Sequence, residues 1–202
     1  MTLERGTDTI ESDRLILRRI TENDLEFFAR IHADPDIALY QGPGRPRSFD
    51  ESRAWLRSTL WTYDNLALGQ LAVLRKSDGT LVGRCGLSDW AVETSAGVCA
   101  VPRAWYERRH APDGAELVFE RELGYTLDRS YWGHGYASEA ARCVFDYARH
   151  VLRLARVISL IHPDNTRSQR VAHRFGLQRE DTVEAMGQPR DRYVWPIDRL
   201  PR

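Results

Sequence analysis

The chain has 202 residues, 42% of them hydrophobic and 29% charged, which is the size and composition of one globular domain. Its 29 basic side chains balance its 29 acidic ones, which argues against a nucleic-acid binder held mainly by phosphate contacts. No apolar run reaches the roughly 20 residues that span a bilayer, and the N-terminal stretch "MTLERGTDTIESDR" is too polar for a signal peptide. We therefore expect a cytoplasmic protein without nucleic-acid or membrane partners.

The first half of the chain predicts a strand followed by two helices. Residues 13–20 form a short apolar segment with β-branched side chains, which is typical of a strand. The apolar side chains of residues 21–37 recur at helical spacing, with Thr21 as a capping residue and Pro35 as the stop signal. After a loop rich in glycine and proline, residues 49–65 indicate a second helix.

The middle of the chain predicts a hairpin and a strand–helix unit. Residues 69–90 read as strand, turn and strand, with the turn at 77–79. Residues 91–115 lack one clear period, and we interpret them as an insertion or a long mobile loop. Residues 116–127 then predict a strand, and residues 136–152 a helix with an apolar stripe.

The last part of the chain completes an α/β pattern. Residues 155–161 indicate a buried strand, residues 165–176 a helix closed by Gly176, and residues 191–197 a final strand. No internal repeat or linker interrupts the pattern. The sequence therefore predicts a single α/β domain.

Three cysteines, Cys85, Cys99 and Cys143, lie far apart without metal or redox spacing. We expect them to be reduced thiols in or near the core, and we expect no metal site.

The stretch "SYWGHGYASEA" (130–140) places two glycines directly before a helix. The first N–H groups of a helix have no partner within it, and glycines let a backbone approach an anion closely, so this arrangement suits phosphate. A plain strand-to-helix turn is the alternative. A dinucleotide fingerprint fails because Ser138 stands where glycine or alanine is required, and the Gly-Lys-Ser/Thr end of a P-loop is missing.

Four stretches in the same order resemble the GNAT acyltransferases, whose acyl-CoA signature is R/Q-x-x-G-x-G/A. They are "ESDRLILRRITENDLEFFARIHADPDI", "LVGRCGL", "ELGYTLDRSYWGHGYASEA" and "HPDNTRSQRVAHRFGL". Within that family the chain looks most like the branch of ribosomal-protein N-terminal acetyltransferases. The resemblance implies one N-acetyltransferase domain over residues 1–202, with a mixed, mostly antiparallel sheet and helices on both faces, and it allows a homodimer.

The resemblance also implies acetyl-CoA or another short acyl-CoA as co-substrate. The end of the strand near Thr126 and Leu127 would pair with the pantetheine arm. Ser130 departs from the signature, whose first position is usually arginine or glutamine, so Arg129 or His134 would have to compensate. Backbone N–H groups would cradle the CoA pyrophosphate, and they belong to Trp132, Gly133, His134, Gly135, Tyr136 and Ala137.

Transfer of an acyl group to an amine requires a neutral amine, and a carboxylate can accept its proton. Glu122, on the strand that leads to the glycines, is the best candidate for this base, with Glu120 in reserve. Alternation places both on one face of the strand with Glu116, and a merely solvated face is the alternative. The opposite face carries Leu117, Phe119 and Leu123.

The acid that protonates the leaving thiolate is harder to assign. Many family members use a tyrosine where Ala172 stands here. Ser168 matches the serine of an N-x-x-S segment in the ribosomal-protein branch, and we expect Ser168 and Asn165 to contact the CoA or its thiolate. Capping of a helix is the alternative role for both residues.

We interpret the chain as an acyl-CoA-dependent N-acyltransferase that acts by direct transfer to a primary amine in a ternary complex. Acetyl is the first candidate for the transferred group. The acceptor is a protein N-terminus or a small molecule. The alternative is a catalytically inactive acyl-CoA-binding regulatory module, because Ser130 and Ala172 are two departures in one site. Aromatic and basic side chains around residues 91–115 could line the acceptor cleft or lie on the surface: Trp90, Trp105, Tyr106, Arg108, Arg109 and His110.

Overall fold

The computed structural model describes residues 9–66, 69–93, 105–107, 110–114 and 116–195. The chain forms two compact units, the first from Met1–Leu87 and Leu123–Leu154, the second from Ser88–Glu122 and Ala155–Arg202. The boundary falls within two strands, β4 (Leu81–Glu93) and β6 (Leu117–Leu127), so each strand contributes to both units. Both units contain strands and helices, which confirms the predicted α/β class.

In the first unit the strand order is β1-β2-β3-β4-β6. β1 (Thr9–Glu11), β2 (Leu15–Arg19), β3 (Gln70–Arg75) and β4 pair antiparallel in that order. Gly79, with φ at +70°, lies in the turn between β3 and β4, which confirms the predicted hairpin.

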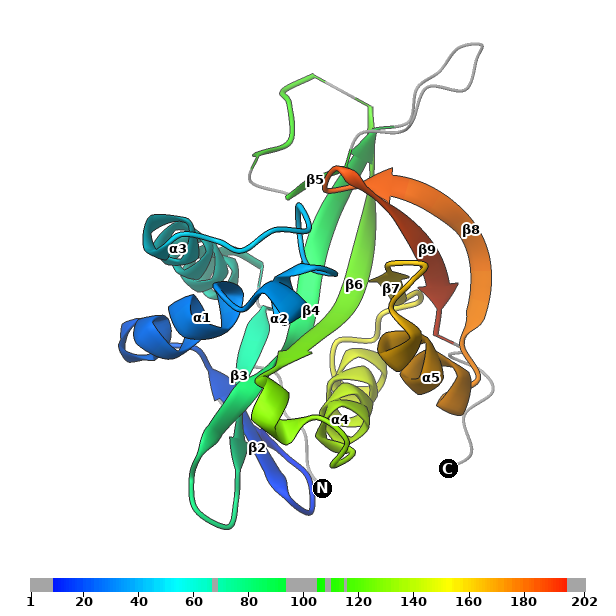
Figure 1. Ribbon diagram of the computed structural model, residues 1–202. Coiled ribbons are helices and arrows are strands. Elements are labelled where there is room, and N and C mark those ends of the chain that lie inside the picture. Colours follow the sequence, from blue (N-terminus) through cyan, green and yellow to red (C-terminus); the bar gives the residue numbers. More distant parts are fainter. Residues whose placement is uncertain (1–8, 67–68, 94–104, 108–109, 115, 196–202) are drawn as a thin grey trace. The chain divides into compact units, whose positions relative to one another are not determined.

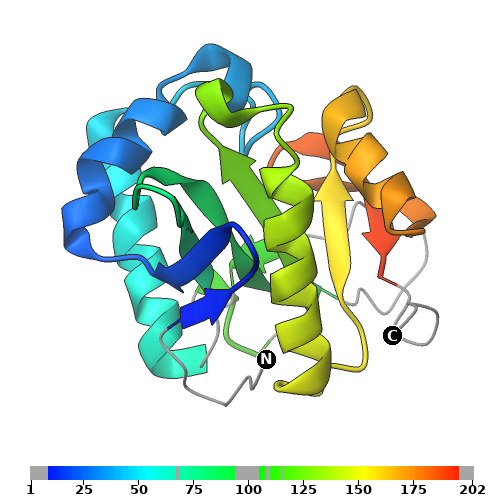
Figure 2. The same cartoon turned by 90° about the horizontal axis from the view of Figure 1, so that it is seen from below.

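Helices cover both faces of the first unit's strands. α1 (Leu25–His32), α2 (Pro35–Ala38) and α3 (Phe49–Leu66) lie on one side, and α4 (Tyr136–His150) lies on the other (Figures 1 and 2). Two short helical turns, η1 (Glu22–Asp24) and η3 (Arg129–Tyr131), precede α1 and α4. The predicted stripe of α4 is buried, with Ala140, Ala141, Val144 and Ala148 all at 2% exposure or less. The core against α1–α3 is formed by Ile20, Phe28, Ile31, Ile37, Leu56 and Ala72.

The break between α1 and α2 follows directly from the local sequence. α1 ends at His32, and the carboxylate of Asp34 accepts the N–H of Asp36 at 2.9 Å, which caps α2. Pro35 is the first residue of α2, where its missing N–H leaves no helical hydrogen bond unmade. The predicted stop at Pro35 is thus confirmed, with a further helical turn after it.

In the second unit β5 (Trp105–Glu107) pairs with β4, and the order continues β4-β6-β7-β9-β8. β6 runs parallel to β7 (Ile158–Ile161), with Glu122 opposite Ile158, whereas β7 pairs antiparallel with β9 (Gln188–Val194). α5 (Thr166–Arg174) contacts β9, since the rings of His173 and Tyr193 lie 6.3 Å apart. The sheet is mostly antiparallel, as predicted.

The longest strand that the sequence analysis missed lies in the second unit, and the short strands β1 and β5 were also missed. β8 (Gln178–Ala185) pairs antiparallel with β9 across a turn in which Met186 and Gly187 both have positive φ. Its side chains are mostly polar and pair across the hairpin: Arg192 contacts Asp181 at 2.6 Å. Because these contacts replace apolar burial, β8 lacks the alternating hydrophobic pattern that reveals most strands.

The segment 91–115 is more ordered in its described part than the sequence suggested. β4 continues to Glu93, and Val92 lies opposite Trp105 of β5, so the prediction of a loop was wrong for these residues. Arg108, Arg109 and Cys99 lie outside the described residues. The thiols of Cys85 and Cys143 are free and buried, and burial raises the pKa of Cys143 to about 11. Among the described helices, none is long and apolar enough to cross a membrane.

Candidate active site

The glycine turn connects β6 to α4 in the first unit. β6 ends at Leu127, η3 follows, and α4 begins at Tyr136. Gly133 and Gly135 have φ values of +82° and +81°, which other residues adopt only with strain. A Cβ added at Gly133 would meet no atom within 4 Å, so backbone conformation rather than crowding accounts for the glycine. The predicted strand–turn–helix arrangement is confirmed.

The beginning of α4 suits an anion. The helical hydrogen bonds begin with the N–H of Glu139, which donates to Gly135 O at 3.1 Å. The first N–H groups of any helix precede its first internal hydrogen bond, and the helix dipole adds positive potential there. The ring of His134 stacks on that of Tyr136 at 5.7 Å, beside this turn. Residues 133–137 can therefore hold a phosphate through their backbone, whereas the N–H of Trp132, predicted to join them, donates to Arg129 O at 3.1 Å.

The end of β6 packs closely on β4. A Cβ at Gly83 would lie 2.3 Å from Thr126 O and 2.7 Å from the Cα of Leu127, so only glycine allows this spacing. Leu127 O accepts a hydrogen bond from the indole Nε1 of Trp132 at 2.9 Å. Both Thr126 and Leu127 are buried, and the indole fixes the start of the turn on the strand that leads into it.

Asp128 holds the turn where the signature departs from its usual form. Its carboxylate accepts the N–H of Ser130 at 2.9 Å and forms an ion pair with Arg30 at 2.7 Å. Burial raises the pKa of Asp128, but these two contacts outweigh it, so the pKa lies below its usual range. Arg129 forms ion pairs with Asp36 and Asp34, and its guanidinium is engaged there.

The two candidate bases, both in the second unit, differ in their partners. Glu120 is held between two guanidinium groups, with Arg156 Nε at 3.1 Å and Arg192 Nη1 at 3.2 Å. Glu122 instead accepts the indole N–H of Trp90 at 2.6 Å. Neither lies on a fully solvated face, and of the three glutamates only Glu116 is exposed. The indole thus holds the Glu122 carboxylate, whereas Glu120 belongs to a network of ion pairs.

A buried arginine accompanies Glu122. Arg190 on β9 is 1% exposed, and its Nη2 donates to Gln188 Oε1 at 3.0 Å. Burial lowers the pKa of Arg190, while the charges of Glu122 and Glu184 act in the opposite direction. Sequence reasoning missed this residue, because β9 was predicted to begin only at residue 191.

Asn165 caps α5 in the second unit. Its Oδ1 accepts the N–H of Ser168 at 3.1 Å, so the capping role considered for Asn165 is present. Ala172, where many family members carry a tyrosine, is buried at 2% exposure. Ser168 is half-buried in the first turn of the helix.

The predicted site residues are divided between the two units. Thr126, Leu127 and residues 132–137 form one local arrangement in the first unit, whereas Glu122, Asn165 and Ser168 belong to the second. Within the described ranges no group of three or more His, Cys, Asp or Glu side chains is arranged to hold a metal ion.

A strand, a glycine turn and a helix start that suits a phosphate define a phosphate-binding class of fold. The family model of the acetyltransferase (GNAT) domain matches residues 14–178, and the chain belongs to this family. It is 25% identical over 198 residues to the N-acetyltransferase p20 of Bacillus licheniformis, covering 94% of this chain and 96% of that protein. The protein is thus a GNAT N-acetyltransferase.

Two further similarities are informative. The chain is 25% identical over 181 residues to the FsC-acetyl coenzyme A-N(2)-transacetylase of Aspergillus fumigatus, covering 88% of this chain and 68% of that protein. An acetyltransferase from Agrobacterium tumefaciens has a TM-score of 0.72 at 23% identity, covering 97% of this chain and 98% of that one. The second similarity shows the fold.

Proposed function

We propose that the protein transfers an acetyl group from acetyl-CoA to a primary amine by direct transfer in a ternary complex. Membership of the GNAT family supports the reaction class. The relative from Aspergillus fumigatus, named for acetyl coenzyme A and an N(2) acceptor, supports the donor and the amine. The observation that carries the proposal is the glycine turn, whose positive φ angles and helix start suit a pyrophosphate.

In this proposal the residues of each group keep the cofactor contacts that the family resemblance implies. The backbone N–H groups of residues 133–137 bind the pyrophosphate, and the strand end at Thr126 and Leu127 pairs with the pantetheine arm. Asn165 and Ser168 contact the thiol end. The cap already uses Oδ1 of Asn165, so its amide NH₂ is the group that would donate to the cofactor.

Glu122 is the proposed base. The amine attacks the thioester carbonyl carbon, so a C–N bond forms as the C–S bond breaks. The amine proton passes to Glu122, directly or through one water. The departing thiolate takes a proton from water to become free CoA, and Glu122 returns its proton to water. The indole Nε1 of Trp90, 2.6 Å from Glu122 Oε2, would hold the proton-accepting carboxylate in one orientation. Ser168 would stabilise the thiolate by a hydrogen bond.

We further propose that the chain is one GNAT domain and that residues 91–115 are an insertion beside the acceptor. Trp105 packs near Trp90, with ring centroids 6.5 Å apart, so β5 lies next to the side chain that holds Glu122. A protein N-terminus, as in the ribosomal-protein branch, and a small amine are both candidate acceptors.

Incubation with acetyl-CoA and a panel of amines, with release of free CoA followed, tests this function. Turnover with at least one amine is expected. Tight CoA binding without transfer to any amine would favour the inactive regulatory module instead. Absence of both binding and turnover at millimolar acetyl-CoA would overturn the proposal.

A further inference from the structure

We propose that Arg14 is a positioning residue for the CoA pyrophosphate, acting through Glu139 and the backbone of the glycine turn. The inference rests on the proposed function. The acyl-CoA signature usually begins with arginine or glutamine, but Ser130 stands there in this chain, and we assign the missing cationic role to Arg14. All the residues involved belong to the first unit.

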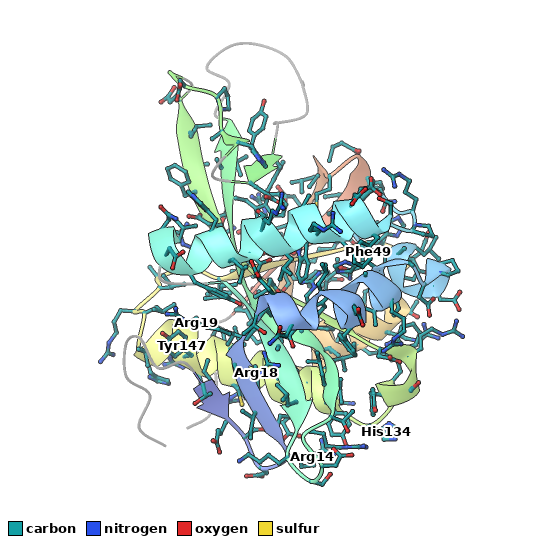
Figure 3. The ribbon with its side chains drawn as sticks, turned by 90° about the vertical axis from the view of Figure 1, so that its left-hand side faces the viewer. Arg14, Arg18, Arg19, Phe49, His134 and Tyr147 are labelled. Atoms are coloured by element: carbon teal, nitrogen blue, oxygen red, sulfur yellow. The ribbon has the colours of Figure 1, made fainter. Side chains whose placement is uncertain are left out.

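Arg14 lies between β1 and β2 and reaches the start of α4. Its Nε donates to Glu139 Oε2 at 2.7 Å, and its Nη1 donates to His134 O at 3.1 Å. Its guanidinium carbon lies 4.7 Å from the ring centroid of Tyr136. Arg14 and His134 are both labelled in the lower part of Figure 3. One side chain therefore holds both the backbone and the first helical residues of the turn.

Glu139 makes such a contact necessary. A carboxylate in the first turn of a helix stabilises the helix by itself, but it carries the same charge as the phosphate that would bind there. Burial raises the pKa of Glu139, yet hydrogen bonds from Ser12 Oγ at 2.6 Å and from Arg14 outweigh it, so the pKa is lowered. Without Arg14 an anionic Glu139 would repel the cofactor.

The other cations considered for this task are engaged elsewhere. Arg129 forms ion pairs with Asp36 and Asp34. The Nδ1 atom of His134 lies 3.1 Å from Trp132 O, which ties the ring back to its own turn. The side chain of Arg14 is 51% exposed, so its charge is accessible beside the glycines while its partner Glu139 is only 18% exposed.

Calorimetric titration with CoA and with 3′-dephospho-CoA tests the inference without relying on activity. Arg14→Met should raise the Kd of both ligands about tenfold, because both contain the pyrophosphate. Adding Glu139→Gln to Arg14→Met should recover most of the loss, since the repelling charge is then gone. Arg14→Lys, which keeps the charge but not the fork geometry, should lose about two- to fivefold.

Arg142→Met is the matched control, because Arg142 lies on the same helix and pairs with Asp146 at 2.9 Å, away from the turn. If Arg14→Met and Arg142→Met lose the same thermal stability and both bind CoA as the wild type does, Arg14 is merely structural and the inference is overturned.

A loss of affinity for CoA but not for 3′-dephospho-CoA would assign Arg14 to the 3′-phosphate and would also overturn the inference. If Arg14→Met does not fold, the other two variants decide. Wild-type CoA affinity in Arg14→Lys, together with unchanged CoA affinity in Glu139→Gln at every salt concentration, would also overturn the inference. A wild type that does not bind CoA would overturn the proposed function itself.

Discussion

The glycine turn of the first unit is formed by backbone groups, whereas the charged strands of the second unit are organised by side chains. The turn is defined by the backbone, through Gly133 and Gly135 at positive φ and the N–H groups that begin α4. In the second unit side chains define the arrangement: Arg156 and Arg192 hold Glu120, and Trp90 holds Glu122. A backbone site needs glycines at fixed positions, whereas a side-chain site needs partners brought from several strands.

The comparison predicts its largest effect for Glu122. Glu122→Gln should lower kcat about 100-fold, or about 2.7 kcal/mol in activation free energy, because an amide cannot accept the amine proton. The loss should be greatest at low pH, where most of the amine is protonated, and the KM for acetyl-CoA should stay within about twofold. Steady-state rates of CoA release, measured across a range of pH values, test this prediction.

Glu116→Gln is the control, because Glu116 precedes the same strand and is exposed. It should leave kcat and its pH profile unchanged. An unchanged pH–rate profile in Glu122→Gln would remove Glu122 from the role of base and leave the backbone turn as the only part of the site with support.

The first unit should be the acid-sensitive one because of His32. The side chain is buried at 6% exposure, and burial, with the charges of Arg84 and Arg47, lowers its pKa from 6.5 to about 2. The unfolded chain binds this proton below pH 6.5 and the folded chain does not, so stability is full above that pH and falls as pH falls. The expected loss is about 2 kcal/mol between pH 6.5 and pH 5.

Urea denaturation at several pH values measures this slope. His32→Leu should flatten the curve between pH 6.5 and pH 5, whatever its effect at pH 8. The ring Nδ1 lies 3.3 Å from Ser52 Oγ, so Ser52→Ala should change overall stability but keep the slope. An equally steep curve in His32→Leu would show that other groups set the acid sensitivity.

The backbone part of the molecule was largely predictable, and the side-chain part was not. Glycine spacing, Pro35 and the turn at 77–79 are local signals, and each marked the right element. β8 was missed because its stabilising contacts, such as Arg192 with Asp181, join residues of two strands and leave no apolar period. Phe119 was assigned to an apolar face of β6 but is 45% exposed, since strand alternation does not say what covers each face. Arg14 and Glu139 meet only through the fold, so no local motif reveals their pairing.

A pair of glycine substitutions separates backbone strain from cofactor binding. Gly133 and Gly79 have φ values of +82° and +70°, and an added Cβ meets nothing within 4 Å at either position. Gly133→Ala and Gly79→Ala should therefore each cost about 1 kcal/mol of stability. Only Gly133→Ala should also raise the Kd for CoA, by about fivefold, because its turn must shift the N–H groups that bind the pyrophosphate. Equal CoA affinity in the two variants would contradict a backbone phosphate site.

The smallest effect concerns Asn165, where a cap and a cofactor contact would use different atoms of one side chain. Asn165→Ala removes the oxygen that accepts the Ser168 N–H and should destabilise the protein by about 1 kcal/mol. Asn165→Asp keeps that oxygen but loses the NH₂ donor, so its stability should match the wild type while the KM for acetyl-CoA rises about threefold. Urea midpoints and steady-state kinetics on the two variants read the two roles separately. If Asn165→Asp has a wild-type KM, the residue is a helix cap alone, and the contact with the thiol end would rest on Ser168.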